Sequence, residues 1–424
     1  MLEIRSIREQ KDELAQRLSK RGVDHNDLLS EAVSIDEQRR NIQQELDELQ
    51  AKMNTLSKEI GDLFKQGERE KAEAAKQETS DLKTRIQELK EGYDKSAGSL
   101  RDVLVQIPNA PHISVPAGTS EADNEVVDTF GDIPELPENA QAHWDLGKEY
   151  GLFDMELGVK ISGAGFPVYM GKGAKLERSL IAFFLDRAIE AGYKEVVPPL
   201  LVNEDSAFAT GQLPDKEGQM YHATEDDLYL IPTAEVPITN IYRDVIVEQK
   251  DLPVKMVGYT PCFRREAGSY GKDVRGLNRV HQFDKVEIVQ IVEPSTSYQV
   301  LDTMVDHVKK LLTDLELPFR VLRLCGGDLG FTSAITYDME VYSAAQKKWL
   351  EVSSISNFES FQSNRLKCRY RGVDKKAALV HTLNGSALAL ARIFAALLEN
   401  GQTPEGIRMP KALVPYTGFE MIEK

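Results

Sequence analysis

Residues 263–289 read FRREAGSYGKDVRGLNRVHQFDKVEIV, and this stretch decides the fold that we expect. It begins at the end of an apolar run, continues as a loop rich in glycine and charge, and ends in a second apolar run. Two strands joined by a flexible loop can fold over a polyanionic ligand. Arginine suits phosphate because its planar fork of donors binds two oxygens at once. The same pattern also fits a solvated charged hairpin, so the segment alone leaves both interpretations open.

Four arginines could together neutralise a triphosphate near this hairpin. Three lie in or beside its loop, and the fourth comes from a distant part of the chain. They are Arg264, Arg275, Arg279 and Arg392.

Three glutamates each lie in or beside an apolar, strand-like run. They are Glu235 in IPTAEV, Glu287 in KVEIV and Glu351 in WLEVSS. A carboxylate in such a run is often an outward-facing edge residue. Three of them near an arginine cluster instead indicate a pocket for an ammonium group and a divalent metal. Glu351 and Ser354 offer the carboxylate and hydroxyl oxygens that Mg²⁺ prefers.

The remaining periodicity predicts an α+β fold with a mostly antiparallel sheet flanked by helices. Strand-like runs greatly outnumber strand–helix–strand alternations, which argues against a dinucleotide-binding fold. We expect helices over residues 175–192 and from Ser386 to Glu399. The expected strands are residues 228–231, 254–263, 285–291, 337–341 and 349–353.

The N-terminal part of the chain has the spacing of a coiled coil. Apolar residues recur in steps of four and three over residues 42–63 and again over 75–93. Gly67 lies between the two runs, and a short loop favours antiparallel neighbours. The pattern predicts a long two-helix arm over about residues 27–100. Its mixed charges fit a dimerisation rod as well as an RNA-binding arm.

The expected domain organisation follows from a change in residue composition after the arm, where prolines interrupt the helical pattern. With 424 residues the chain is long enough for two domains. We expect an N-terminal domain over residues 1–106, a proline-rich linker over 107–125 and a catalytic domain over 126–424.

Composition narrows the class of protein further. The net charge is 52 − 68 = −16, which argues against a nonspecific nucleic-acid coat. We expect no DNA partner. No stretch is apolar enough for a membrane span, and the first residues do not read as a signal peptide, so we expect a cytoplasmic protein. The three cysteines and seven histidines show no disulfide or metal-ligand spacing.

Several segments together resemble the class II aminoacyl-tRNA synthetases in their seryl form. Residues 254–291 resemble motif 2, residues 175–201 motif 1 with its proline at Pro199, and residues 382–399 motif 3. The stretches IPTAE at 231–235 and EVSS at 351–354 match as well. With the helical arm, the resemblance to bacterial-type seryl-tRNA synthetases (serine–tRNA ligases) covers essentially the whole chain.

The resemblance implies a homodimeric ligase that attaches L-serine to tRNA(Ser) through a seryl-adenylate. ATP is a substrate, Mg²⁺ is the metal, and dimerisation runs through motif 1. The arm binds the long variable arm of tRNA(Ser), and tRNA(Sec) is a further substrate where that tRNA exists. Three alternatives remain: another class II synthetase, an aminoacyl:carrier-protein ligase and a non-catalytic RNA-binding paralogue. The seryl-type HQFDKVE stretch, the arm and the complete ligand set argue against them in turn.

The resemblance also implies roles for individual residues. Arg264 binds the α-phosphate, Glu266 the adenine side, and Arg392 the terminal phosphates; these three form the catalytic set. The expected ATP-binding residues are Arg264, Arg265, Glu266, Arg279, Phe283, Glu351, Val352, Ser353, Ser354 and Arg392. The expected serine-binding residues are Thr233, Ala234, Glu235, Arg264, Glu287, Asn384 and Ser386, with Glu287 facing the ammonium group. The expected metal ligands are Glu351 and Ser354.

A few positions depart from the family pattern. Gly165 stands where arginine is frequent before Phe166, and Ala387 and Ala391 stand where motif 3 often has glycine. Arg265 is often serine. None of these departures removes an expected ligand.

Overall fold

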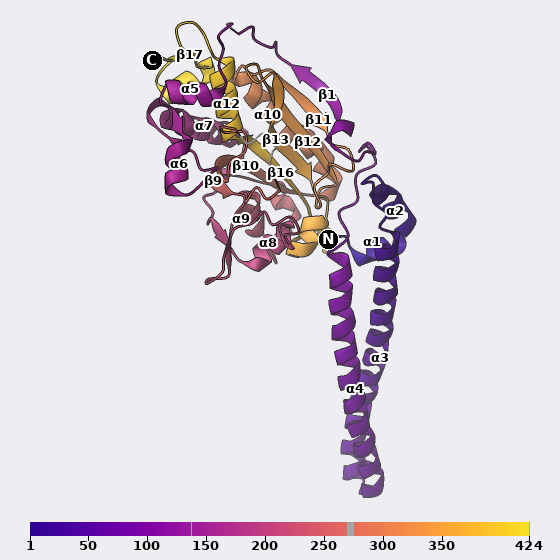
Figure 1. Ribbon diagram of the computed structural model, residues 1–424. Coiled ribbons are helices and arrows are strands. Elements are labelled where there is room, and N and C mark those ends of the chain that lie inside the picture. The colour runs from indigo at the N-terminus through magenta and orange to yellow at the C-terminus, as the bar shows by residue number, and fades with distance from the viewer. Residues whose placement is uncertain (137, 269–274, 424) are drawn as a thin grey trace. The chain divides into compact units, whose positions relative to one another are not determined.

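The computed structural model describes residues 1–136, 138–268 and 275–423 (Figure 1). The chain forms two compact units. One contains Met1–Ser19 and Val23–Pro108, and the other contains Lys20–Gly22 and Asn109–Lys424. Residues 269–274, in the middle of the expected motif 2 loop, lie outside the described residues.

The first unit consists of two short and two long helices. These are α1 (Ile4–Glu9), α2 (Lys11–Ser19), α3 (Asn26–Lys65) and α4 (Arg69–Leu104). The expected two-helix arm is confirmed, and its 40-residue helix α3 spans about 60 Å at about 1.5 Å per residue. Gly67 has φ = +79°, a left-handed conformation that glycine adopts readily, and it makes the turn between the helices.

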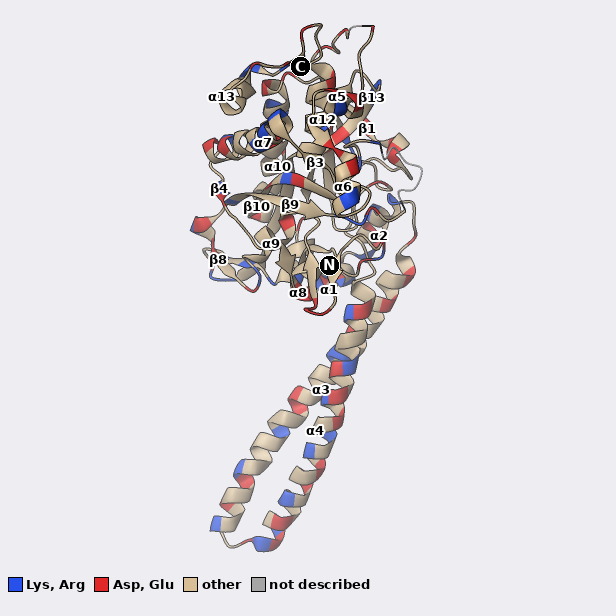
Figure 2. Cartoon of the chain, turned by 60° about the vertical axis from the view of Figure 1, so that its left-hand side comes forward, with Lys and Arg blue, Asp and Glu red and all other residues tan. Residues whose placement is uncertain are grey.

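The arm has a narrow apolar seam and a charged surface. Leu46, Ile86 and Leu89 are buried between α3 and α4. Across the seam, Lys52 pairs with Glu78 at 2.7 Å and Arg85 with Glu45 at 2.9 Å. Figure 2 shows positive and negative side chains interspersed along both helices. Such exposed pairs contribute little to stability, so the seam holds the hairpin together.

The second unit is built on an eight-stranded sheet among the described residues, in the order β1-β11-β12-β13-β16-β10-β9-β4. Every neighbouring pair is antiparallel except β4 and β9. The strands are β1 (Glu125–Phe130), β4 (Lys194–Glu195), β9 (Val254–Phe263), β10 (Gln282–Val292), β11 (Phe319–Arg323), β12 (Ile335–Ser343), β13 (Lys348–Asn357) and β16 (His381–Ala389). The expected antiparallel sheet is thus confirmed.

Smaller sheets and helices surround this sheet. The short strands are β2 (Phe153–Asp154), β3 (Val168–Tyr169), β5 (Leu201–Val202), β6 (His222–Ala223), β7 (Leu228–Leu230), β8 (Ile246–Glu248), β14 (Arg369–Arg371), β15 (Ala377–Leu379), β17 (Ile407–Arg408) and β18 (Met421–Ile422). The helices are α5 (His143–Glu149), α6 (Met155–Ile161), α7 (Gly171–Glu190), α8 (Glu204–Thr210), α9 (Glu235–Asn240), α10 (Ser297–Asp314), α11 (Phe361–Leu366), α12 (Leu390–Asn400) and α13 (Val414–Thr417). No helix in the described part of the chain is both long and apolar enough to cross a bilayer.

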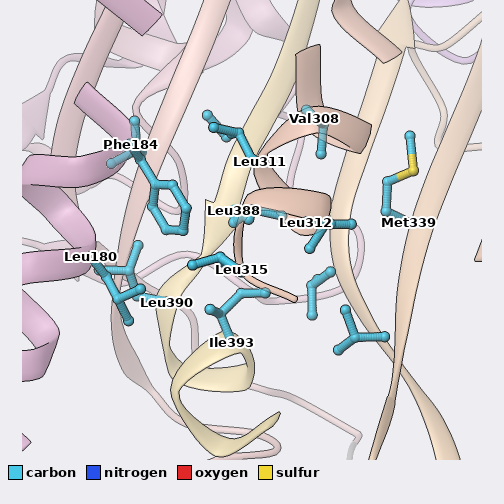
Figure 3. Packing of buried hydrophobic residues seen from close by; sticks show 14 of the residues in the cluster. Leu180, Phe184, Val308, Leu311, Leu312, Leu315, Met339, Leu388, Leu390 and Ile393 are labelled. Atoms are coloured by element: carbon cyan, nitrogen blue, oxygen red, sulfur yellow. The ribbon is translucent and has the colours of Figure 1, made fainter. Parts of the chain in front are cut away.

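The main core lies between the large sheet and three of its helices. Figure 3 shows Phe184 of α7, Leu312 of α10 and Ile393 of α12 meeting over Leu388 of β16. Burying a side chain of this size stabilises the fold by about 1.5–3 kcal/mol. The packed helices therefore hold one face of the sheet rigid.

One expectation about local structure was wrong. The C-terminal helix begins at Leu390 rather than Ser386, because residues up to Ala389 continue β16 and pair with β10. Glu235, expected in or beside a strand-like run, follows β7 and is the first residue of the short helix α9.

Candidate active site

A pocket of about 560 Å³ is lined by residues of the central strands β10, β12, β13 and β16 and of the segments beside them. Most of the residues expected to bind ATP or serine line it. They are Thr233, Glu235, Arg264, Glu266, Arg279, Phe283, Glu287, Glu351, Val352, Ser353, Ser354, Asn384, Ser386 and Arg392. Residues from five separate segments of the sequence thus meet in one cavity.

Three expected residues are not part of the pocket lining. Ala234 is fully buried, and Arg265 is exposed with its backbone N–H donating to the carbonyl of Gln219. Arg275 is also exposed and lies 4.5 Å above the ring of Trp144. The structure therefore gathers Arg264, Arg279 and Arg392, without Arg275, at the pocket.

A β-bulge explains why Glu351 and Ser354 both reach the pocket. Side chains three residues apart in a regular strand point to opposite faces of the sheet. In β13 the pairing shifts, so that Met339 and Glu340 of β12 face Ser353 and Glu351, and Val352 is the extra residue. One extra residue turns the next side chain back to the same face. The bulge thus brings a carboxylate and a hydroxyl together.

A second irregularity shapes the start of motif 3. Lys285 and Glu287 of β10, two residues apart, face Ala389 and Ser386 of β16, which are three apart. Leu388 in the inserted stretch has φ = +94°, an unusual value for a residue with a branched side chain. The bulge leaves the Ser386 hydroxyl 3.2 Å from Oε2 of Glu287 and ends the strand where α12 begins.

The arginine side of the pocket is held by neighbouring groups. The Arg264 guanidinium lies 5.2 Å from the centre of the Phe283 ring, and its Nε donates to the carbonyl of Pro232. Arg279 donates to Oε2 of Glu266 at 3.1 Å. These contacts orient both guanidinium groups before any ligand arrives.

Arg392 is oriented by backbone carbonyls. Its Nε donates to the carbonyl oxygen of Asn278 at 3.0 Å, and its Nη1 donates to that of Glu351 at 2.6 Å. The Glu351 carboxylate lies 3.7 Å away. Arg392 therefore ties motif 3 to the end of the motif 2 loop and to the bulged strand β13.

The acidic side contains two buried carboxylates and one buried ammonium group. Lys285 lies 2.7 Å from Oε2 of Glu287 and donates to the hydroxyl of Thr233 at 2.9 Å. Oε1 of Glu287 is buried and has no hydrogen-bond partner among the described residues. With Glu235 and Glu287 ionised, the two carboxylates and Lys285 carry a net charge of −1. This end of the pocket suits a small cation.

Both oxygens of Glu235 accept hydrogen bonds from amide side chains. Gln362 donates to Oε1 at 2.6 Å, and Asn384 donates to Oε2 at 2.7 Å. Burial, together with the nearby Glu287 carboxylate, raises the pKa of Glu235 from 4.5 to about 7. The amide donors and Lys285 act in the opposite direction.

Sequence reasoning missed Lys285 and Gln362. Lys285 lies in the same HQFDKVE stretch as Glu287, two residues before it, and residues two apart in a strand share a face. That spacing could have indicated a lysine in the pocket. Gln362 lies on α11, in a segment without a chemical pattern, so no sequence signal pointed to it.

A further buried network anchors the motif 2 loop from behind. His143 accepts from the backbone N–H of Leu277 at its Nε2, so its Nδ1 carries the proton that it donates to Glu399 at 2.7 Å. Ser343 and Gln346 also donate to Glu399. Burial would raise the pKa of Glu399, but the hydrogen bonds from His143 and Ser343 outweigh it and lower this pKa.

The antiparallel sheet and the pocket over its central strands define a class II aminoacyl-tRNA synthetase core. Residues 219–401 match the family described as "tRNA synthetase class II core domain (G, H, P, S and T)". Residues 1–111 match the "Seryl-tRNA synthetase N-terminal domain".

Comparisons over the whole chain identify the particular family. The serine–tRNA ligase of Salinibacter ruber is 50% identical over 100% of this chain and 99% of its own. The seryl-tRNA synthetase of Pyrococcus horikoshii, solved with ATP, is 35% identical with a TM-score of 0.93, over 100% and 99% of the two chains. The cytoplasmic enzyme of Naegleria fowleri, solved with AMP, is 26% identical with a TM-score of 0.88 over the same shares. The chain belongs to the seryl-tRNA synthetase family.

Proposed function

We propose that this chain is a serine–tRNA ligase that uses ATP to attach L-serine to tRNA(Ser) through a seryl-adenylate. One observation carries the proposal: a single pocket joins a cluster of arginines to a buried acidic end. The arginines suit the phosphates of ATP, and the acidic end suits the ammonium group of an amino acid. The carboxylate of the amino acid would then lie between the two, beside the α-phosphate.

In the first step the serine carboxylate attacks the α-phosphorus, and pyrophosphate leaves. Arg264 binds the α-phosphate, where charge builds up, and Arg279 and Arg392 bind the leaving phosphates. Phe283 stacks on the adenine ring of ATP, and Glu266 binds the adenine side of the same nucleotide. In the second step a hydroxyl of the terminal ribose of the tRNA loses its proton and bonds to the acyl carbon, the acyl–phosphate bond breaks, and AMP leaves. No protein nucleophile takes part, so catalysis rests on positioning and on charge neutralisation.

Glu287 receives the ammonium group of serine, because its Oε1 is buried without a partner among the described residues. Thr233, Glu235, Asn384 and Ser386 surround the rest of the amino acid. Their hydrogen bonds to the serine hydroxyl would disfavour alanine, since alanine would leave buried polar groups unpaired.

The donors of the pocket fit a Mg²⁺ ion that arrives with the nucleotide. Glu351 and Ser354 share one face of β13, and Mg²⁺ is commonly held by one or two protein carboxylates plus substrate phosphates. Mg²⁺ bound there would neutralise phosphate charge.

The partners follow from the same assignment. The α3–α4 arm binds the variable arm of tRNA(Ser) by shape and backbone, and tRNA(Sec) is a further substrate where it exists. The enzyme is a cytoplasmic homodimer that pairs through motif 1. Exposed apolar side chains at Ile189, Val197 and Leu201 support this surface as an interface.

The decisive experiment is serine-dependent exchange of pyrophosphate into ATP, run beside alanine, threonine and glycine, followed by charging of purified tRNA(Ser). We expect exchange with serine alone, and charging that needs serine, ATP and Mg²⁺. Exchange with another amino acid would keep the fold and overturn the specificity. A lack of exchange with all four would favour a non-catalytic paralogue, although no observation supports it, since Arg264, Glu266, Glu351 and Arg392 all line the pocket.

A further inference from the structure

Gln362 is a buried amide that none of the roles above uses. It belongs to α11, it is 1% exposed, and it is not part of the pocket lining. Its Nε2 donates to Oε1 of Glu235 at 2.6 Å and to the carbonyl oxygen of Thr210 at 3.2 Å. Its Oε1 accepts from the hydroxyl of Thr382 at 2.8 Å. Every polar atom of this side chain therefore has a partner.

These partners fix the orientation of the amide. Rotating it by 180° would place its oxygen against two acceptors, the Glu235 carboxylate and the Thr210 carbonyl. Both N–H groups are therefore committed, one to the carboxylate and one to the backbone of α8. The contact with Glu235 is a charge-assisted hydrogen bond in a buried place, which is stronger than a neutral one.

We propose that Gln362 is a positioning residue for amino-acid binding, because it holds Oε1 of Glu235 so that the ionised carboxylate accepts a hydrogen bond from bound serine. Asn384 holds the other oxygen from β16. Each carboxylate oxygen keeps a second lone pair for an N–H or O–H donor of the substrate. This inference rests on the proposed function, since it assigns a role within the same serine site.

The surroundings of Glu235 make this donor important for ionisation. β10 contributes Glu287, which disfavours a second negative charge, and Lys285, which favours it. The charged residues of α8, Glu204 and Asp205, are exposed, and Arg365 of α11 donates to the carbonyl of Phe208. Loss of the hydrogen bond from Gln362 would stabilise the neutral acid form of Glu235 relative to its carboxylate form.

The test compares wild type with Q362M, which keeps the length of the side chain and removes both donors. We expect the KM for serine in pyrophosphate exchange to rise about 10- to 100-fold, the range for losing a hydrogen bond to a charged group. The KM for ATP at saturating serine should stay within about twofold of wild type. In Q362M, the midpoint of the increase in kcat/KM for serine with pH should lie at a higher pH than in wild type.

Two further variants test the same contact of Gln362. Thr382→Val removes only the hydroxyl behind the amide and should leave the serine KM within about threefold of wild type, because Thr210 still orients Gln362. If Q362M does not fold, Q362E preserves the shape; its serine kcat/KM should fall as pH rises, because an ionised carboxylate there repels Glu235. Equal changes in the serine and ATP constants, or an unmoved pH profile, would overturn the role of Gln362. A wild type inactive with serine would overturn the proposed function instead.

Discussion

Glu235 must be ionised to accept two amide donors and a substrate donor at once, and its buried position opposes that charge. Because its pKa is raised from 4.5 to about 7, the folded protein keeps a proton on it in weakly acidic solution. The ionised fraction grows as pH rises through about 7. The net charge of the pocket therefore changes at a pH near neutrality.

Serine activation should follow this ionisation. We expect kcat/KM for serine in pyrophosphate exchange to increase about tenfold for each pH unit below about pH 7 and to level off above it. The ATP dependence at saturating serine serves as the control, since bound serine holds Glu235 in its ionised form. A serine profile that is flat between pH 5.5 and 8 would contradict the assignment of Glu235.

Glu287→Gln tests the cation site at the acidic end. The substitution removes the negative charge that balances Lys285 and replaces the free Oε1 by a neutral group. We expect the KM for serine to rise at least tenfold and the KM for ATP to change little. Glu293→Gln is the matched control, because that carboxylate lies beyond the end of β10 and accepts from Gln249. Equal effects on both substrates would argue against an ammonium contact.

Most of the site residues predicted from the sequence line the pocket, but the sequence did not show how they meet. Glu351 and Ser354 are three apart, which in a regular strand places them on opposite faces, and only the bulge at Val352 unites them. Arg275 could not be distinguished from the other arginines by sequence, because its contact with Trp144 depends on tertiary packing.

Gly165, with φ = +83°, has no room for a side chain: an added Cβ would lie 2.3 Å from the His281 ring. Glycine at position 165, where we noted that arginine is frequent, therefore fits the positive φ and the close approach of His281.

At the scale of elements, the two antiparallel strands β9 and β10 were the easiest part to predict. Their apolar runs are long and the loop between them is polar, so local pattern and tertiary position agree. The boundary between β16 and α12 was predicted wrongly, because the run SALALAR is a good helix former. Pairing with β10 outweighs that propensity as far as Ala389.

The network of His143 and Glu399 joins α5 and α12 to the end of the motif 2 loop. His143→Leu would leave the buried N–H of Leu277 without its acceptor and loosen Asn278 and Arg279, which line the pocket. We expect the KM for ATP to rise about tenfold while the KM for serine changes less than threefold. His222→Leu on β6 is the matched control, since its partner Asp227 is exposed. A variant with unchanged ATP kinetics would show that the network only supports the fold.

At the scale of the whole molecule, the arm and the pocket belong to different compact units, which allows their roles to be tested separately. The family models match residues in both units, over 1–111 and 219–401. The long heptad pattern made the arm predictable from sequence alone, whereas its charges gave no sign of a partner.

A shortened arm should separate the two steps of the reaction. Ile42 and Gly92 face each other across the hairpin, since a Cβ built on Gly92 would lie 3.8 Å from Cδ1 of Ile42. Deleting residues 43–91 and joining these positions with a short glycine turn removes the distal arm and keeps its base. We expect pyrophosphate exchange within about twofold of wild type and a fall in tRNA(Ser) charging of at least 100-fold, if the arm supplies most of the tRNA affinity. Unchanged charging would refute the proposed role of the arm.

The regular seam between α3 and α4 also allows the length of the arm to change in fixed steps. Because the apolar positions repeat every seven residues, a heptad inserted at matching places in both helices preserves the pairing. Each such insertion would extend the hairpin by about 10 Å at about 1.5 Å per residue, and each deletion would shorten it equally. The reach of the arm can therefore change in discrete steps without any change in the pocket. A graded set of arm lengths would reveal how closely the hairpin is matched to the dimensions of the tRNA that we propose it binds.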